Sequence, residues 1–260
     1  MYENVVLAIG GSDSGGGAGI QADLRTFMSL KVHGCSAITC VTAQNSLGVN
    51  SLEPIKEEII KSQIEAVVSD FQVKALKTGM LLNESIINAI SIQLNNYSIP
   101  KIIDPVMVSR AGATLIDKSA INAYKKFLFP QADLITPNIY EANLLLGLNI
   151  KNEQDIEAAG FNLLELGPKS VLIKGGGINN LKGKDYFINS KGESYWFHSD
   201  FIDTKNTHGS GCTLSAAICS YIGKGLNLIE SINEAKLFVK ESLINSYKIG
   251  KGPGPLGHYQ

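Results

Sequence analysis

Short apolar runs alternate with amphipathic stretches along this chain, and the alternation restricts the folds that are open to it. Residues 5–9 are apolar throughout, which is typical of a strand buried on both faces of a sheet. Similar runs predict strands at residues 36–41, 75–78, 102–103, 134–135 and 171–174. Between the runs, apolar residues recur at helical spacing, as they do from Ile59 to Val68. The alternation predicts an α/β fold with a mostly parallel central sheet.

The remaining elements complete this pattern. Helices are expected at residues 20–28, 59–68, 86–94, 153–166 and 228–247, with two more that begin near Tyr140 and Cys212. Residues 185–188 and 194–197 flank Asn189-Ser-Lys-Gly192 and predict a small antiparallel hairpin. Because no internal repeat, linker or change of composition divides the sequence, we expect a single domain over residues 1–260.

Charge and cysteine content argue against several classes of function. The 23 Lys and Arg residues nearly balance the 24 Asp and Glu residues, and no basic run indicates a nucleic-acid partner. None of the four cysteines lies in a C-x-x-C pair, so neither a zinc ribbon nor a redox pair is expected. We expect no secretory leader and no apolar run near the ~18 residues of a membrane span. A cytoplasmic protein with reduced thiols is the resulting expectation.

Polar side chains gather where the predicted strands end. They are Ser12-Asp13, Gln44-Asn45, Asp104, Asn138 and Lys174. Any one of them could simply cap the helix that follows. In an open parallel sheet, however, the ligand crevice lies at the carboxyl ends of the strands. Taken as a group, these residues therefore indicate a binding site at that edge.

The segment from Gly209 to Cys212 reads Gly-Ser-Gly-Cys and opens onto a predicted helix. A helix start presents unpaired N–H groups and a partial positive charge, and glycine lets the backbone approach a ligand closely. Together these features favour an anion site, with phosphate as the usual guest. Cys212 at the helix start is expected to have a lowered thiol pKa. The alternative is a glycine-rich turn beside a small packed cysteine.

Phosphoryl transfer needs cations and backbone donors around phosphate, a metal, and a group that takes the acceptor's proton. Asp104 and Glu141 could supply oxygen ligands to Mg²⁺, which is usually held by one or two carboxylates. Lys174 could act as a point charge on phosphate. The alternatives are a turn residue for Asp104, an exposed first-turn charge for Glu141 and a solvent-exposed strand end for Lys174.

Other enzyme classes match the sequence less well. The P-loop signature is missing, since Gly183-Lys184 is followed by Asp185. Residues 17–22 match a G-x-G-x-x-A dinucleotide motif, but they lie too far beyond the first strand, and no acidic residue ends the second. A cysteine acyl-transfer enzyme would pair His208 with Cys212, yet no orienting carboxylate is obvious. A dinucleotide oxidoreductase stays the remote alternative.

Taken together, these motifs resemble the hydroxymethylpyrimidine/phosphomethylpyrimidine kinases of thiamine biosynthesis, in the ribokinase-like superfamily. The similarity spans nearly the whole chain, and its motifs are found at residues 11–23, 42–46, 77–80, 104–108, 136–141, 203–212 and 252–258. The resemblance implies a three-layer sandwich, with helices on both faces of a mostly parallel sheet. It also implies ATP and Mg²⁺ as cofactors and phosphorylation of a hydroxymethylpyrimidine and its monophosphate.

The resemblance also implies roles for individual residues. Gln44 would pair with the pyrimidine edge, because an amide both donates and accepts hydrogen bonds. The rest of the substrate pocket would comprise Gly11, Ala18, Asp23, Met80 and Val106. Lys174, Thr207 and Asn138 would contact ATP, and Asp104 and Glu141 would face the metal. The anion hole would comprise Gly209, Ser210, Gly211 and Cys212, with Cys212 in the place where most of the superfamily has an aspartate base.

The chain departs from the family pattern at two places. Ser210 replaces the usual threonine, which should matter little. Ser109 and Arg110 follow Val108 in the expected lid, where some similar pyridoxal kinases carry a cysteine. The missing cysteine favours the pyrimidine over pyridoxal, which stays open as an alternative substrate, as does the second phosphorylation step. A homodimer that binds neither nucleic acid nor membrane is expected.

Overall fold

A nine-stranded sheet forms the centre of the protein, in the strand order β3-β2-β1-β4-β5-β6-β7-β8-β9. The computed structural model describes residues 4–108, 116–178 and 181–259. The strands are β1 (Val5–Asp13), β2 (His33–Asn45), β3 (Gly48–Pro54), β4 (Val73–Thr78), β5 (Lys101–Ile103), β6 (Leu134–Ile135), β7 (Ser170–Lys174), β8 (Lys184–Asn189) and β9 (Ser194–His198). All neighbouring pairs from β2 to β7 are parallel, whereas β3, β8 and β9 each pair antiparallel with the strand before them.

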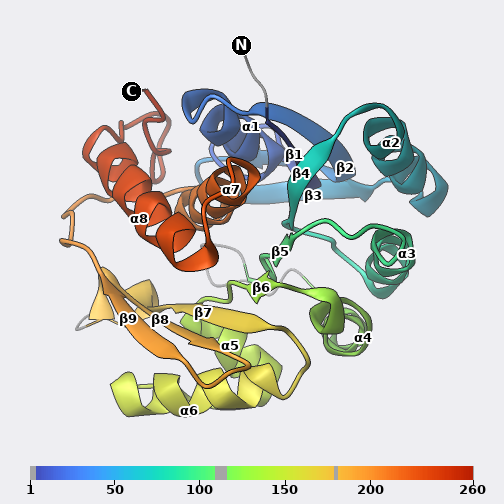
Figure 1. The fold of residues 1–260 in the computed structure, drawn as a ribbon. Coiled ribbons are helices and arrows are strands. Elements are labelled where there is room, and N and C mark those ends of the chain that lie inside the picture. Colours follow the sequence, from blue (N-terminus) through green and yellow to red (C-terminus); the bar gives the residue numbers. More distant parts are fainter. Residues whose placement is uncertain (1–3, 109–115, 179–180, 260) are drawn as a thin grey trace.

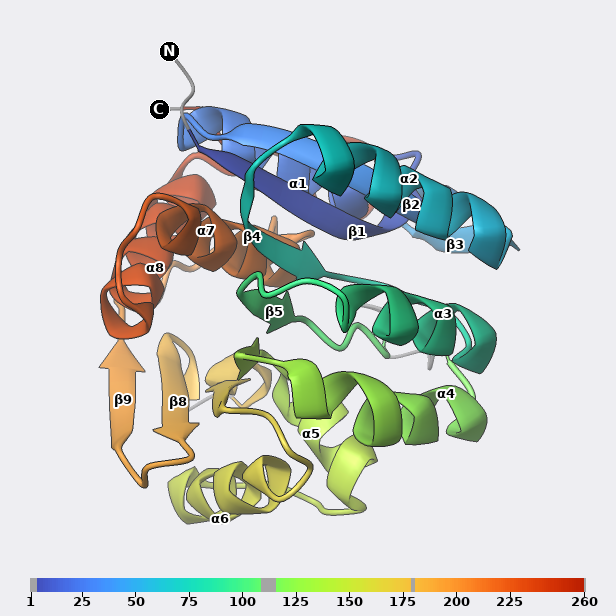
Figure 2. The ribbon, with the colours of Figure 1, turned by 45° about the vertical axis from the view of Figure 1, so that its right-hand side comes forward.

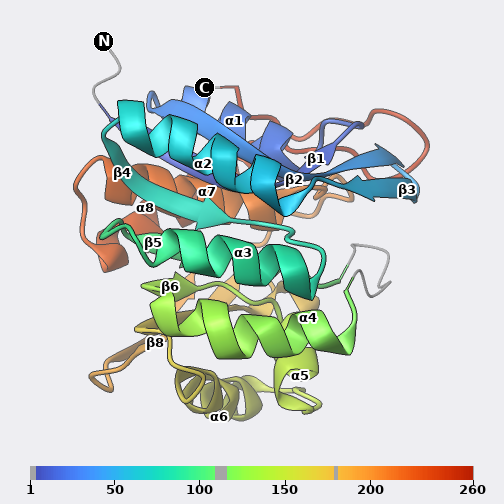
Figure 3. The same ribbon diagram turned by 90° about the vertical axis from the view of Figure 1, so that its right-hand side faces the viewer.

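Helices cover both faces of this sheet and complete the predicted three layers (Figures 1 and 3). They are α1 (Gly19–Ser29), α2 (Glu57–Asp70), α3 (Glu84–Leu94), α4 (Lys118–Ala123), α5 (Ile139–Leu146), α6 (Glu153–Leu164), α7 (Ser210–Gly223) and α8 (Leu228–Ile244). One face carries α1, α7 and α8, and the other carries α2 to α6 (Figure 3). None of the helices in the described part of the chain combines the length and apolar character that a bilayer span requires.

The sheet separates two hydrophobic cores, which explains why its first strand is apolar throughout. Leu7 and Ile9 belong to the core beneath α2 to α6, whereas Val6 and Ala8 belong to the core beneath α1, α7 and α8. Side chains alternate between the two faces of a strand, so a strand covered on both faces needs apolar residues at successive positions. Full burial of each large apolar side chain contributes roughly 1.5–3 kcal/mol, and two such cores fix the sheet between its helix layers.

The structure adds elements that the sequence patterns did not predict. β3 pairs antiparallel with the second half of β2 and projects at the sheet edge opposite β8 and β9 (Figure 2). Its side chains are mostly exposed, so it lacks the apolar run that marks a buried strand. α4 is short and continues as a π-helical turn over Tyr124–Leu128, which interrupts the regular helical spacing. The predicted hairpin is confirmed as β8 and β9.

The strand order switches sides at β1, and this switch places the site. β1 pairs with β2 on one side and β4 on the other, so the order of the strands along the chain changes there. In an open parallel sheet, such a switch point opens a crevice beyond the carboxyl ends of the strands. β1 ends at Asp13, β4 at Thr78 and β7 at Lys174, so the polar residues after these strands share one edge.

Candidate functional site

A cavity of about 1220 Å³ lies at the carboxyl ends of β1, β4, β5, β6 and β7. Every residue that the sequence analysis assigned to a substrate, phosphate or metal site lines it. These residues are Gly11, Ala18, Asp23, Gln44, Met80, Asp104, Val106, Asn138, Glu141, Lys174, Thr207, Gly209, Ser210, Gly211 and Cys212. Ser109 and Arg110, which were expected in a lid, lie outside the described residues.

The start of α7 forms the end of the cavity that suits an anion. Gly209 is the N-cap residue at φ 85°, and within the described chain no side chain caps this helix. A Cβ at Gly209 would lie only 2.0 Å from the carbonyl oxygen of Gly17, so the position requires glycine. By contrast, Asn138 caps α5 and Asn227 caps α8 with their side chains. The N–H of Ser210 donates to the carbonyl oxygen of Thr207 at 3.2 Å. The N–H groups of Gly211 and Cys212 have no such partner among the described residues, so they stay available to a phosphate oxygen.

Lys174 lies beside this helix start and is held there by Asp104. Its Nζ donates to Asp104 Oδ1 at 2.8 Å and would lie 3.3 Å from a Cβ built on Gly211. Asp104 also accepts from Thr136 Oγ1 at 3.1 Å and from Ser215 Oγ at 3.1 Å. The Lys174 side chain is only 14% exposed, which excludes the alternative of a lysine in solvent. A buried carboxylate therefore fixes a cation next to the anion site.

Glu141 is buried rather than exposed, so the alternative of a solvated first-turn charge is wrong. It completes a capping box with Asn138, whose backbone N–H donates to Glu141 Oε2 at 2.8 Å. The backbone N–H of Met107 donates to Glu141 Oε1 at 3.3 Å. Burial raises the pKa of Glu141 to about 7. The charge of Lys174 opposes this shift, and the nearby charge of Asp104 adds to it. A cation at this place would stabilise the ionised carboxylate.

Asp104 and Glu141 together fit Mg²⁺ better than a transition metal. In residues 4–108, 116–178 and 181–259, no three His, Cys, Asp or Glu side chains gather as a metal cluster. Zinc sites need three or four such ligands, whereas Mg²⁺ uses one or two carboxylates with water and phosphate. The charge of Asp104 contributes to the raised pKa of Glu141, so a bound cation would stabilise both carboxylates in their ionised forms.

Cys212 lines the cavity, but its pKa differs from the prediction. Burial raises the pKa of this thiol to about 11, although the charge of Lys77 and the backbone N–H of Gly19 both lower it. The expected lowering of the pKa is therefore wrong for this structure, because removal of water from the thiolate outweighs the lowering influences of Lys77 and the Gly19 N–H. The thiol is protonated at neutral pH and is a strong base once ionised.

A buried ion pair in the cavity wall was missed by reasoning from the sequence. Lys77 Nζ lies 2.9 Å from Asp23 Oδ1, and both side chains are within 1% of full burial. Burial lowers the pKa of Lys77, but Asp23, Cys212 and Asp104 together raise it above its ordinary value. The lysine was visible in the motif at residues 77–80, yet no local pattern shows that a strand-end lysine is buried.

Asp13 organises the glycine-rich loop and holds His208. Its carboxylate accepts from the backbone N–H groups of Gly15, Gly17 and Ala18 at 2.8 to 3.1 Å. His208 Nε2 lies 3.0 Å from Asp13 Oδ2. Burial raises the pKa of Asp13, but His208 and the loop N–H groups hold it below its usual value. Asp13 is thus a carboxylate partner of His208 that the sequence did not reveal. Among the described residues, however, His208 makes no hydrogen bond to Cys212, which the acyl-transfer alternative requires.

Gln44 lies at the same end of the cavity as His208. Its Nε2 is 3.5 Å from His208 Nε2, and its Oε1 accepts from Thr42 Oγ1 at 3.3 Å. The start of the loop is fixed to Gln44 as well, because Ser14 Oγ donates to its backbone oxygen at 2.8 Å. The amide therefore stands in a polar corner of the cavity wall, where it could both donate to and accept from a ring edge.

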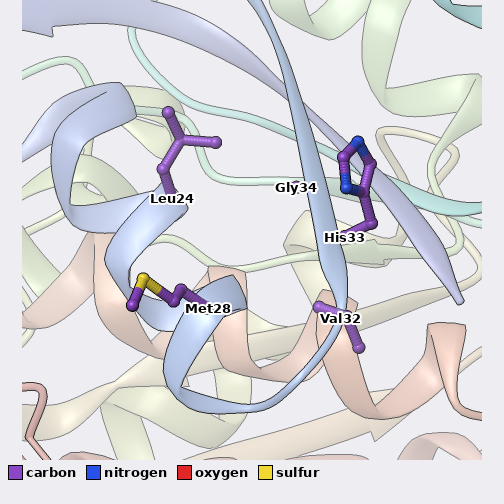
Figure 4. A pocket seen from close by; sticks show the side chains of 5 residues that line it. All are labelled: Leu24, Met28, Val32, His33 and Gly34. Carbon is purple, nitrogen blue, oxygen red and sulfur yellow. The ribbon is translucent and has the colours of Figure 1, made fainter. Parts of the chain in front are cut away.

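A second hollow, of about 240 Å³, lies at the amino end of β2 (Figure 4). Leu24 and Met28 of α1 line it with Val32, His33 and Gly34 (Figure 4). It lies away from the carboxyl edge of the sheet and includes none of the predicted site residues. The large cavity is accordingly the candidate site.

Comparison with known proteins finds relatives along nearly the whole chain. A family model described as phosphomethylpyrimidine kinase matches residues 13–257. A hydroxymethylpyrimidine/phosphomethylpyrimidine kinase of Synechococcus elongatus is 48% identical over 260 residues, which cover 100% of this chain and 98% of the relative. A phosphomethylpyrimidine kinase structure from Clostridium difficile is 39% identical with a TM-score of 0.83 and covers 93% of this chain and 100% of its own. An ADP complex of Bacillus subtilis pyridoxal kinase is 34% identical with a TM-score of 0.91, over 98% of this chain and 97% of the other.

Proposed function

The chain belongs to the phosphomethylpyrimidine kinase family, and from that premise we propose that it phosphorylates 4-amino-5-hydroxymethyl-2-methylpyrimidine with ATP. The monophosphate produced is the second acceptor, and the pathway served is thiamine diphosphate biosynthesis. The observation that carries this proposal is one cavity that combines an uncapped helix start, a fixed lysine and a polar corner at Gln44. A remote role as a dinucleotide oxidoreductase has no comparable support.

At the phosphate end of the cavity, backbone N–H groups and a lysine would stabilise the negative charge of the phosphates without forming a covalent bond. The turn formed by Gly209, Ser210, Gly211 and Cys212 would receive the transferred phosphoryl group through its free N–H groups, and Lys174 would neutralise part of its charge. Thr207 and Asn138 line the same region and would contact the other phosphates of ATP. Donors held in place before the reaction stabilise charge that develops in the transition state, because they need no reorganisation.

At the acceptor end, Cys212 would take the proton of the hydroxymethyl group. The hydroxyl oxygen forms a bond to the γ-phosphorus while the bond from that phosphorus to the β,γ-bridging oxygen breaks, and ADP leaves. The hydroxyl proton passes to the Cys212 thiolate. In the second step a phosphate oxygen of the monophosphate attacks, so no hydroxyl proton has to be removed.

Asp104 and Glu141 would hold Mg²⁺, directly or through its waters. The bound ion would neutralise charge on the phosphates during transfer. Because the pKa of Glu141 lies near 7, its carboxylate is half protonated there, and cation binding would release that proton. Affinity for Mg²⁺ should therefore rise as the pH increases from about 6 to 8.

Isosteric removal of each charge tests this assignment. Asp104→Asn and Glu141→Gln are expected to raise the Mg²⁺ concentration for half-maximal activity by about tenfold or more, since each removes a carboxylate ligand. In Glu141→Gln the pH dependence of Mg²⁺ affinity should also flatten. Glu153→Gln, outside the cavity, serves as the control. Unchanged Mg²⁺ dependence in both cavity variants would place the cation elsewhere.

Gln44 is proposed to select the pyrimidine. Gln44→Leu leaves the buried partner groups of the ring unpaired, which costs roughly 1–3 kcal/mol. The KM for the pyrimidine should rise by about tenfold to hundredfold, whereas the KM for ATP should stay within about twofold. Gln154→Leu, the same chemical change at an exposed position of α6, should alter neither value. An unchanged pyrimidine KM in Gln44→Leu would remove Gln44 from the pocket.

The decisive experiment for the activity is an ATP-consumption assay with Mg²⁺ and three acceptors. These are the hydroxymethylpyrimidine, its monophosphate and pyridoxal. We expect ADP formation with both pyrimidines and a lower kcat/KM with pyridoxal, whose kinases share this fold. A higher kcat/KM for pyridoxal would reassign the substrate. Tight NADH binding without ATP turnover would reject kinase function.

We also propose that residues 1–260 act as one domain and that the protein is a cytoplasmic homodimer. The continuity of one sheet from β3 to β9 supports the first part. Light scattering behind a sizing column would report the oligomeric state, with a mass twice that of the chain as the expected value.

A further inference from the structure

The C-terminal segment, residues 250–258, packs along the edge of the candidate site. It contains the Gly-Pro-Gly-Pro-Leu-Gly-His sequence that none of the roles assigned above uses. Pro253 lines the cavity, and Pro255 forms an isolated bridge with His208. The segment is therefore part of the site's surroundings, although it is irregular in structure.

Backbone contacts tie this segment to loops on both sides of the cavity. Gly252 N–H donates to Ser46 Oγ at 3.0 Å, next to the turn that follows Gln44. Gly254 N–H donates to Asn206 Oδ1 at 3.0 Å, and its carbonyl accepts from the N–H of His208 at 3.1 Å. The substrate end and the phosphate end of the cavity are thus bound to the same short piece of chain.

The fit of this segment is close enough to require glycine. A Cβ at Gly254 would lie 1.9 Å from the carbonyl oxygen of Tyr247 and 2.9 Å from Asn206 Oδ1. No rotamer adjustment relieves a clash with backbone, so a side chain here would push the segment away from the loop. The contacts to Asn206 and His208 consequently depend on the bare backbone at this position.

His258 connects the segment to the first turn of α7. Its Nε2 lies 2.9 Å from Thr213 Oγ1, and both side chains are buried. Its Nδ1 has no hydrogen-bond partner among the described residues, so the Thr213 contact is the one hydrogen bond of the ring there. Phe238 also packs against the ring, with the two centroids 6.3 Å apart. Burial and, to a lesser degree, Arg25 lower the pKa of His258 to about 4, which keeps the imidazole neutral at neutral pH. Thr213 follows Cys212 directly in the chain.

We propose that the C-terminal segment positions the anion-binding turn of α7 through the His258–Thr213 hydrogen bond. Within the described chain the turn has no side-chain cap of its own, so its geometry depends on what packs around it. His258 contacts Thr213 in the first turn of α7, while the Gly254 carbonyl accepts from His208 N–H just before the turn. His258 is a positioning residue: it acts on the donors and the thiol through Thr213 and does not touch the substrate.

The test compares substitutions that keep or remove the bridging nitrogen. His258→Gln places an amide nitrogen near the position of Nε2, whereas His258→Ala and the shorter His258→Asn cannot reach Thr213. We expect His258→Ala and His258→Asn to lower kcat by about tenfold to hundredfold, since small misplacements of reacting groups have effects of that size. The KM for ATP should change by less than about threefold, and His258→Gln should recover most of kcat.

Thr213 supplies the complementary change. Thr213→Val is isosteric and removes only the hydroxyl, so its loss of kcat should match that of His258→Ala. Because both act through one hydrogen bond, the double variant should be no slower than either single variant. Additive losses would overturn the proposal. Tyr259→Ala, which truncates a side chain that is 77% exposed, is the control and should leave kcat unchanged.

Amide hydrogen exchange of residues 209–213 tests the same idea without the activity. In His258→Ala this turn should exchange about tenfold faster than in the wild type or in His258→Gln. Unchanged exchange would overturn the proposal, as would a loss of thermal stability without any loss of kcat below the melting transition. The kcat readout rests on the proposed kinase function, but the exchange readout does not. An inactive wild-type protein would therefore reject the function and leave the exchange result to decide on the positioning role.

Discussion

Replacement of Cys212 by alanine is expected to lower kcat for the hydroxymethylpyrimidine by roughly 10²–10⁴-fold, the usual contribution of a positioned general base. The KM for ATP should stay nearly unchanged, because the backbone donors of the α7 turn remain. Cys212→Asp restores the base of the wider superfamily and should recover part of the rate. Steady-state kinetics at saturating ATP and Mg²⁺ measure these values. Cys219→Ala, at a buried cysteine later in the same helix, is the matched control.

The pH profile of the same reaction gives an independent reading. Since burial raises the pKa of Cys212 to about 11, the reactive thiolate is scarce at neutral pH. The value of kcat/KM reports groups of the free enzyme, so it should climb about tenfold per pH unit between roughly pH 7 and 10. In Cys212→Ala this slope should vanish. Alkylation of Cys212 should inactivate the enzyme, and bound pyrimidine should protect it. Full kcat in Cys212→Ala would reduce the cysteine to a packing residue.

The largest expected effect on stability comes from Lys77→Met. This change leaves the Asp23 carboxylate buried without its partner, which typically costs about 3–5 kcal/mol of unfolding free energy. The double variant Lys77→Met/Asp23→Asn removes the uncompensated charge and should regain most of the loss. Urea unfolding monitored by circular dichroism measures both values. Lys240→Met, in an exposed pair with Asp200, should change stability little.

The loss in Lys77→Met should depend on pH with a definite sign. Burial raises the pKa of Asp23 to about 6 in the folded protein, above its ordinary value of 3.8. A raised folded pKa means that stability is favoured at low pH and lost as the pH rises through the folded value. Removal of the Lys77 charge raises this pKa further. The deficit of the variant should therefore be greatest near pH 8 and shrink toward pH 5. A deficit independent of pH would show that Asp23 is not the group left unpaired.

The sequence was sufficient to predict the parts of the fold that depend on local patterns. Buried parallel strands need apolar residues at successive positions, so residues 5–9 and 171–174 were recognisable as strands. β3 was missed because an exposed edge strand needs no such run. α4 was missed because it is short and runs into a π-helical turn. Local periodicity reports burial within one element, whereas edge strands owe their structure to a partner strand.

For the site, the sequence predicted where groups would meet but not how they would interact. Parallel strands bring their carboxyl ends together, which is why Asp104, Glu141 and Lys174 line one cavity. The pairing of Lys77 with Asp23 joins residues 54 positions apart, and no local pattern encodes it. The predicted direction of the shift in the pKa of Cys212 was wrong for a related reason. The helix start is visible in the sequence, but the degree of burial that opposes it is a property of the whole fold.

The helices that form opposite walls of the cavity pack in different hydrophobic cores. Cys212 stands on α7, whose Ala217 and Ile218 pack in the core shared with α1 and α8. Glu141 stands on α5, whose Ile139 and Ala142 pack in the core on the other face of the sheet. Cys212 and Glu141 therefore stand on helices that pack in different cores, on opposite faces of the sheet. A substitution in one core is therefore expected to shift the residues on one wall of the cavity and to leave those on the other wall in place.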